Sequence, residues 1–297
     1  MTTGLGGTNV SRNPSDLGLL ERLRQPGPIV TVELRPPPRG LAAAEGMNTW
    51  IDLNHSIRNL ALRDVFVFLT DDAVGSREEE NLTHLSSNVG SDVPLSRLIP
   101  FLTCKHTLEH CLMYADRAQS LGFEALTVLG GDTSAGPARC LPHAYMLRER
   151  IRERQPDLAL GGWANPHSDI GQQVEYLTAA NFSADFFLTQ IVSHHSMDRV
   201  DAFLEECALR NVTIPGIFGV FYYRSAHSGT LEKLKEFFPV PAEHLRKEFE
   251  SGAKPEEVLV RTLNALRSAG VDKVYVSNFG HRRVQDHLTR VLVDRTS

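Results

Sequence analysis

The regular alternation of strand-like and helix-like segments is the feature that most constrains the fold of this chain. Short apolar or β-branched runs recur about every 25–40 residues, and an amphipathic helical stretch follows each one. Strict alternation predicts a parallel sheet, and eight units favour a closed (β/α)8 TIM barrel over the alternative, an open doubly wound sheet. Strands are expected near 28–34, 63–70, 97–103, 124–129, 157–162, 185–190, 212–219 and 272–277. Helices are expected near 41–60, 78–89, 107–121, 141–153, 170–181, 197–210, 230–250, 255–269 and 281–293.

The chain reads as one domain with a short irregular start. Residues 1–13 are predicted to be a flexible N-terminus, and residues 11–26 have the pattern of an extra helix before the first strand. No linker or repeat divides the remainder, so residues 14–297 are expected to form a single barrel, for which this length is normal. The longest insertion, Phe221–Lys254, is predicted to form a lid or a side wall.

Composition excludes several classes of function. Apolar residues make up 41% of the chain and charged residues 23%, as in a globular protein with a sizeable core. The net charge of −5 and the lack of a Lys/Arg block argue against a nucleic-acid partner. No apolar run approaches the roughly 20 residues needed to cross a bilayer. The four cysteines lack paired spacing, so reduced thiols in a cytoplasmic protein are expected. No oligomer interface is recognisable, and a monomer is compatible with the sequence.

Polar and aromatic residues gather where the predicted strands end, which is where barrels of this kind hold their active sites. Glu33 ends the first strand, and Pro36–Pro38 then force the chain to turn. Acids, amides and aromatic rings dominate this set, which suits a planar heterocycle held by hydrogen bonds between rings. The strand-end residues include Glu33, Thr70, Thr103, Lys105, Asp132, Trp163, His167, Gln190, Phe218, Tyr223 and Asn278.

Five of these segments carry a resemblance to methylenetetrahydrofolate reductases. Val-Glu-Leu-Arg-Pro-Pro-Pro-Arg (32–39) resembles their Phe-Glu-Phe-Phe-Pro-Pro-Arg, and Phe-Leu-Thr-Cys (101–104) resembles their His-Leu-Thr-Cys. Leu-Gly-Gly-Asp (129–132) is similar to Leu-Arg-Gly-Asp, Leu-Thr-Gln (188–190) to Ile-Thr-Gln, and Ile-Pro-Gly-Ile (214–217) to the same four residues. Each segment alone is weak, but order and spacing agree over roughly nine-tenths of the chain, in a pattern typical of a barrel.

The resemblance implies roles for several residues. Glu33 would be the general acid that helps open the imidazolidine ring to an N5 iminium, for which burial must raise its pKa. Asp132 and Gln190 would bind the pterin edge, and Thr103 and Tyr223 would complete the substrate site. Other interpretations stay open: an ion pair of Glu33 with Arg35 or Arg39, a helix cap for Asp132, and a satisfied strand-end amide for Gln190.

The chain departs from the family at its flavin site. Family members carry a histidine, an arginine and an Arg-Lys pair where this chain has Phe101, Gly130 and Thr178-Ala179. Thr70-Asp71-Asp72 replaces Thr-Tyr-Gly and adds negative charge where a diphosphate would lie. Because buried phosphates need cations or helix N-termini, FAD is expected to be absent. NADH would then deliver hydride directly to methylenetetrahydrofolate, as in a flavin-independent branch of the family. FAD-dependent reduction remains the alternative.

Direct transfer requires nicotinamide and pterin to be bound together, face to face. Trp163, Phe218, Phe221, Tyr222 and Tyr223 are candidate walls for the two rings, and core packing is the other interpretation for each. The residues predicted to contact NADH are Thr70, Trp163, His167, Phe218 and Arg282. The cations that could receive phosphates or the folate tail are Arg39, Lys105, Arg224, Arg282 and Arg283.

No metal is predicted from the sequence. His106 and His110 have helical spacing near Cys104 and Cys111, but without an established third ligand a zinc site is not expected. The pair His194-His195 is expected to line or flank the pocket. A folate-binding accessory barrel that has lost catalysis is the remaining alternative, and the joint presence of Glu33, Asp132 and Gln190 argues against it.

Overall fold

Eight parallel strands close into a barrel in a computed structural model that describes residues 17–38, 40–71, 81–90, 92–132, 136–280 and 286–289. Each strand pairs with the next, and β1 pairs with β8 through Val32 and Val276, so the sheet has no edge. This confirms the predicted (β/α)8 barrel and excludes the open sheet. The strands are β1 (Ile29–Leu34), β2 (Val67–Leu69), β3 (Leu98–Thr103), β4 (Ala125–Leu129), β5 (Ala159–Ala164), β6 (Phe186–Val192), β7 (Gly216–Phe221) and β8 (Lys273–Ser277).

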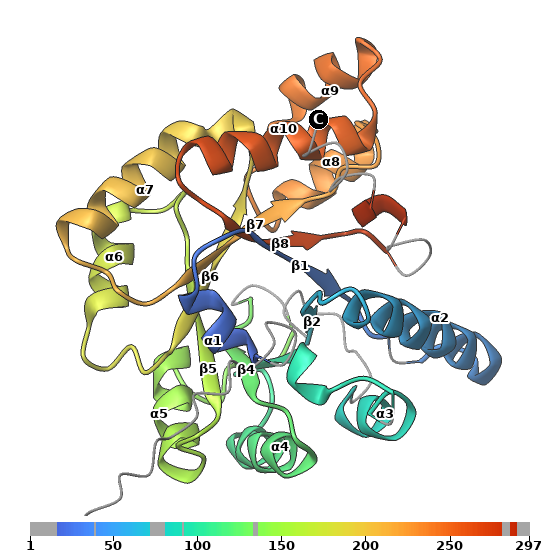
Figure 1. Ribbon diagram of the computed structural model, residues 1–297, viewed down its shortest axis with the longest axis vertical. Helices are drawn as coiled ribbons and strands as arrows, with labels where there is room; N and C mark the ends of the chain where they lie inside the picture. The colour runs from blue at the N-terminus through green and yellow to red at the C-terminus, as the bar shows by residue number, and fades with distance from the viewer. Residues whose placement is uncertain are drawn as a thin grey trace, which may run out of the picture.

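Helices surround the strands in the order that the sequence predicts (Figure 1). Local signals explain several boundaries: the Thr107 and Asp169 side chains cap α4 and α6, and Gly122 ends α4 with a positive φ of 97°. The α-helices are α1 (Leu19–Arg24), α2 (Ala43–Ala61), α3 (Asn81–Asn88), α4 (Leu108–Leu121), α5 (Ala144–Arg154), α6 (Ile170–Thr178), α7 (Met197–Leu209), α8 (Ser228–Lys235), α9 (Ala242–Glu250) and α10 (Pro255–Ser268). The 3-10 turns η2 (Leu95–Arg97) and η3 (His194–Ser196) precede β3 and α7.

Prolines account for two boundaries that the sequence misplaces. The predicted strand 212–219 begins only at Gly216, because Pro215 has no N–H to give to a ladder. The predicted helix 230–250 is divided into α8 and α9, with Pro239 and Pro241 between them. Of the predicted last helix, residues 286–289 are helical, and the rest lies outside the described residues.

The core has two layers, one inside the barrel and one between the strands and the helices. Phe68, Ile99, Phe101, Leu188 and Tyr275 are among the buried side chains that fill the interior. The outward-facing side chains of the same strands pack against the helices in a second, larger cluster. Together the two layers hold the strand ends in fixed positions.

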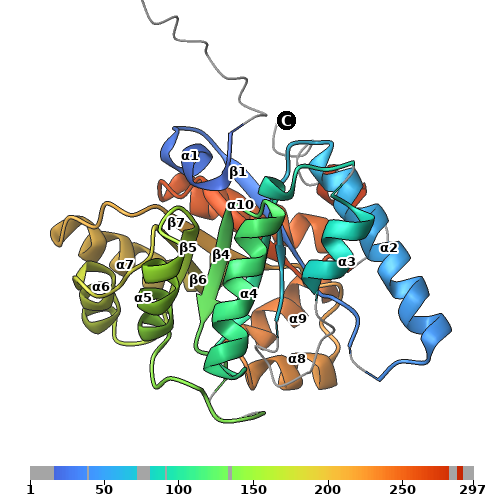
Figure 2. The ribbon, with the colours of Figure 1, turned by 90° about the horizontal axis from the view of Figure 1, so that it is seen from below.

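The two ends of the barrel differ. Leu19 and Leu23 of the N-terminal helix α1 pack with Ile29 and Phe186, so α1 covers the end where the strands begin. Figure 2 shows α1 at that end and α8 and α9 at the opposite end, where the strands finish. Part of the predicted 11–26 helix is therefore confirmed as α1, while residues 1–13 lie outside the described residues and their flexibility stays a prediction. Among the described helices, none is both long and apolar enough to span a bilayer.

Candidate active site

A cavity of about 870 Å³ opens at the carboxyl ends of the strands, within the size range of small-molecule sites. Its floor comes from strand ends and its side wall from α8 and the segment after it, as predicted for the insertion 221–254. The charged and polar lining residues are Glu33, Arg35, Thr70, Asp132, Arg139, Gln190, Thr230, Lys233, Glu236, Ser277 and Asn278. The aromatic lining residues are Phe101, Trp163, Phe221, Phe237, Phe238 and Tyr275.

Glu33 lies in this floor near the end of β1. The Ser277 hydroxyl of the neighbouring strand β8 donates a hydrogen bond to Glu33 Oε1 at 3.2 Å. Burial raises the pKa of Glu33, while the charge of Arg35 and the Ser277 hydrogen bond lower it by less. A carboxyl that keeps its proton at a higher pH than usual, beside a cavity, can act as a general acid.

Tyr275 of β8 lies near Glu33 and binds β6, two strands away. Its buried hydroxyl donates to the Thr189 carbonyl at 2.7 Å, and burial together with the negative charge of Glu33 raises the pKa of Tyr275. Glycine is required opposite this ring, because a Cβ on Gly219 would lie 2.5 Å from the Tyr275 oxygen. The phenol is thus a neutral hydrogen-bond donor whose position is set by packing.

Gln190 reaches the cavity through an irregularity in β6. Leu188 pairs with Ile217 but Ile191 pairs with Gly219, so Thr189 and Gln190 together lie opposite Phe218 as a β-bulge. The Gln190 amide accepts a hydrogen bond from the Ile191 N–H at 2.9 Å and donates one to the Phe237 carbonyl at 3.2 Å. The side chain therefore lines the cavity as predicted, and its amide also joins the strand end to the wall.

The segment that follows β4 brings Asp132 and the cation Arg139 to the main cavity. Asp132 lines the cavity, and the Arg139 guanidinium lies against Gly130, where an added Cβ would be 2.8 Å from Arg139 Cζ. Arg139 also donates to the Gly131 carbonyl, and its buried Nε has no hydrogen-bond partner among the described residues. The position that carries arginine in the resembling family is glycine here, but a different arginine supplies positive charge beside it.

Four of the described residues predicted to bind substrate or NADH do not line this cavity, and neither do the candidate wall Tyr222 and the candidate cations Lys105 and Arg224. Thr103 is fully buried, and its N–H and hydroxyl donate to Asp71 Oδ2 at 2.7 and 3.0 Å. The Asp71 carboxylate also contacts the His106 ring at 2.9 Å, so its negative charge faces β3 and not the cavity. Phe218 faces the opposite side of the sheet and packs edge-on against Phe203.

His167 and Tyr223, the other two, line a second, smaller cavity of about 190 Å³. The His167 ring lies 2.8 Å from the Ile191 carbonyl. Tyr223 is buried, and burial raises the pKa of its hydroxyl. Of the remaining predicted cofactor contacts, Thr70 and Trp163 line the main cavity, while Arg282 lies outside the described residues, as do Arg39, Asp72 and Arg283.

The sequence did not point to Arg139, Lys233, Glu236, Phe237 and Phe238, which all line the main cavity. Lys233 belongs to α8, and the next three residues follow closely after it. The only sequence signal for this wall was the length of the insertion between β7 and β8. Arg139 lies in a loop, where no periodicity indicates the direction of a side chain.

Comparisons with known proteins show the fold. No family model matches the chain, and no curated protein matches it in sequence. The structure of an uncharacterized protein from Clostridium thermocellum that binds two copies of 5-methyl-5,6,7,8-tetrahydrofolic acid matches with a TM-score of 0.68 and 15% identity, covering 93% of this chain and 99% of that chain. The carboxyl transferase domain of Rhizobium etli pyruvate carboxylase, with pyruvate, matches with a TM-score of 0.52 and 12% identity, covering 89% of this chain and 41% of that chain.

Proposed function

We propose that this chain is a methylenetetrahydrofolate reductase that transfers hydride from NADH directly to its folate substrate. The observation that carries the proposal is Glu33, a carboxyl of raised pKa in the floor of a cavity walled by aromatic rings. The Clostridium thermocellum barrel, whose ligand is a reduced folate, supports folate as the ligand class. The motif resemblance around Glu33, Asp132 and Gln190 supports the reaction.

In the proposed reaction Glu33 gives its proton to the ring nitrogen that leaves the methylene carbon as the imidazolidine ring opens. The remaining N5 iminium carbon accepts hydride from NADH, which gives 5-methyltetrahydrofolate and NAD⁺. The Glu33 carboxylate then regains a proton from solvent. Trp163, Phe221 and Phe238 are the aromatic side chains available to hold pterin and nicotinamide against each other.

Three cationic side chains line the cavity, Arg35, Arg139 and Lys233, beside the carboxyl groups of Asp132 and Glu236 and the proposed acid Glu33. These cations are suited to the folate carboxylates or to the NADH phosphates, and they would equally suit a flavin diphosphate. The proposal that FAD is absent therefore depends on the sequence differences from the resembling family at its flavin site. The absorbance spectrum of the purified protein tests that absence directly. A yellow protein with bound flavin would contradict it.

A folate-binding barrel without catalysis is the second candidate. It is favoured by the Clostridium thermocellum barrel, whose description names a bound reduced folate and no reaction. The two candidates differ in turnover, because only the reductase consumes NADH when methylenetetrahydrofolate is present.

The deciding experiment is anaerobic turnover of flavin-stripped protein, followed by the loss of NADH absorbance. Glu33→Gln is expected to lower turnover by at least about 100-fold, the usual contribution of a general acid, while folate binding stays measurable by calorimetry. Glu45→Gln, an exposed change on α2, is the control and should retain full turnover. Binding of 5-methyltetrahydrofolate without NADH consumption by the unaltered protein would favour the non-catalytic candidate. Full turnover by Glu33→Gln would remove this residue from the mechanism.

A further inference from the structure

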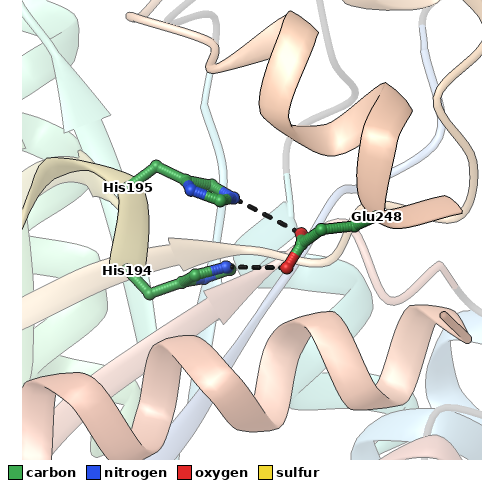
Figure 3. Close-up of side chains that lie close together, drawn as sticks. All are labelled: His194, His195 and Glu248. Atoms are coloured by element: carbon green, nitrogen blue, oxygen red, sulfur yellow. Dashed lines mark hydrogen bonds and ion pairs between the residues drawn. The ribbon is translucent and has the colours of Figure 1, made fainter. Parts of the chain in front are cut away.

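Two histidines and a glutamate meet beside the carboxyl end of β6, outside the main cavity. His194 and His195 form the short turn η3, and Glu248 reaches them from α9 (Figure 3). His194 Nε2 lies 3.0 Å from Glu248 Oε1, and His195 Nε2 lies 3.3 Å from Glu248 Oε2. One candidate ligand atom from each residue lies within 4.8 Å of the others. Residues more than 50 positions apart thus bring three possible metal-ligating atoms close together.

The surrounding residues orient the first ring. His194 Nδ1 lies 2.8 Å from the hydroxyl of Thr262, a buried residue of α10. That hydroxyl also contacts the Val258 carbonyl at 3.4 Å, so it can accept from an Nδ1–H of His194 while donating to the carbonyl. Without an ion, the His194 Nε2–H donates to Glu248 Oε1. A bound metal would take the place of that proton, and the Nδ1–H would then donate to Thr262. An outer hydrogen bond of this kind is what metal-ligating histidines have in proteins.

Open space adjoins the histidines. His195, Ser193 and Tyr223 line the cavity of about 190 Å³ described above. The Tyr223 side chain is buried, and its hydroxyl has no hydrogen-bond partner within the described part of the chain. A water or a small anion on the metal would lie in this cavity, which Tyr223 also lines.

We propose that His194, His195 and Glu248 bind a zinc ion, with a fourth position open toward the smaller cavity. Zinc is bound by imidazole and carboxylate at about 2.0–2.1 Å, which places tetrahedral neighbours roughly 3.3 Å apart. The observed separations of 3.0 and 3.3 Å agree with that spacing. Zinc binds such nitrogen and oxygen sets more tightly than ferrous iron or manganese does. The ion would fasten α9, and with it the wall of the main cavity, to the end of β6.

A purely structural ion-pair cluster is the competing explanation. Arg261 Nη1 lies 2.7 Å from Glu248 Oε1 and neutralises part of its charge. The two explanations predict different effects on zinc affinity when this arginine is removed. A zinc site should bind its ion more tightly without the competing cation, whereas an ion-pair cluster gains no affinity for zinc.

The test is calorimetric titration of the full-length, chelator-treated protein with zinc chloride, with cobalt(II) as a spectroscopic probe. One ion per chain is expected, together with the visible absorption of four-coordinate cobalt. His195→Ala and Glu248→Gln should each weaken zinc binding by about 100-fold or more. Arg261→Ala should strengthen it by about tenfold. His55→Ala, an exposed histidine on α2, is the matched control and should bind zinc unchanged.

Two results would overturn the proposal. One is the lack of saturable 1:1 binding by the unaltered protein. The other is equal affinity in the unaltered protein and in Glu248→Gln. If His195→Ala or Glu248→Gln fails to fold, as judged by circular dichroism, Arg261→Ala still decides, because unchanged or weaker zinc binding by that variant contradicts the proposed site.

Discussion

Glu33 and Glu248 are the same side chain in two settings, and their acidities move in opposite directions. Glu33 lies in the barrel floor, where burial outweighs Arg35 and Ser277 and raises its pKa. Glu248 lies on α9 and faces η3, where hydrogen bonds from Arg261, His194 and His195 outweigh burial and lower its pKa. The difference shows that the balance between burial and the hydrogen-bond donors around a carboxyl sets the direction of its pKa shift.

Removing the charge of Glu248 should have the larger effect on stability. Its side chain is only 14% exposed and contacts two histidines and an arginine. Glu248→Gln should therefore cost about 2 kcal/mol of unfolding free energy at pH 7. Because the folded pKa lies below the unfolded value near 4.5, this stabilisation is present above pH 4.5 and is lost as the pH falls through the folded pKa. Urea unfolding of metal-free protein at pH 7 and at low pH measures both values. A difference between the two proteins that stays constant over this range would contradict the assignment.

Removing the charge of Glu33 should stabilise the protein. Its folded pKa lies above the unfolded value, so its contribution to stability is complete below about pH 4.5 and is lost as the pH rises through the folded pKa. Glutamine is neutral at every pH and can still accept from Ser277. Glu33→Gln should therefore raise the unfolding free energy by about 1 kcal/mol at pH 8 and by almost nothing at pH 4.5. A stabilising change that lowers activity is common at active sites. Thermal unfolding at the two pH values tests this, and a loss of stability at pH 8 would contradict it.

The smallest expected effect comes from the hydrogen bond between Ser277 and Glu33. Ser277→Ala removes a donor that favours the charged form of Glu33, so the pKa of Glu33 should rise further. If the proposed reaction holds, the alkaline limb of the turnover profile should move to higher pH without loss of the maximal rate. Tyr275→Phe is a useful contrast, because it removes a hydroxyl that donates to Thr189 and not to Glu33. A shift of the profile to lower pH in Ser277→Ala would contradict this account.

The barrel could be predicted from the sequence because apolar runs at regular spacing mark the strands. Glu33, Asp132, Gln190 and Trp163 could be predicted in the cavity because strand ends converge there. Phe218 was misjudged although alternation could have corrected it: Ile217 faces the interior, so its neighbour must face the helices. Thr103 was taken from the resemblance, and only the fold shows Asp71 occupying its hydroxyl.

Other parts of the site depend on contacts that no local pattern encodes. The bulge that directs Gln190 arises from the pairing of two strands, and Arg139 approaches Gly130 from a loop. The meeting of His194 and His195 with Glu248 brings η3 and α9 together across more than 50 residues of sequence. Such arrangements are set by tertiary packing, which local periodicity does not report.

The helix α1, which covers the end where the strands begin, has a consequence for kinetics. With that end filled by Leu19 and Leu23, the main cavity, within the described part of the chain, opens at the carboxyl ends of the strands. Two molecules that must stack inside it have to enter in sequence, and the one nearest Glu33 is then the last to leave. Under the proposed function, steady-state data should therefore show an obligatory order of addition, with the folate first.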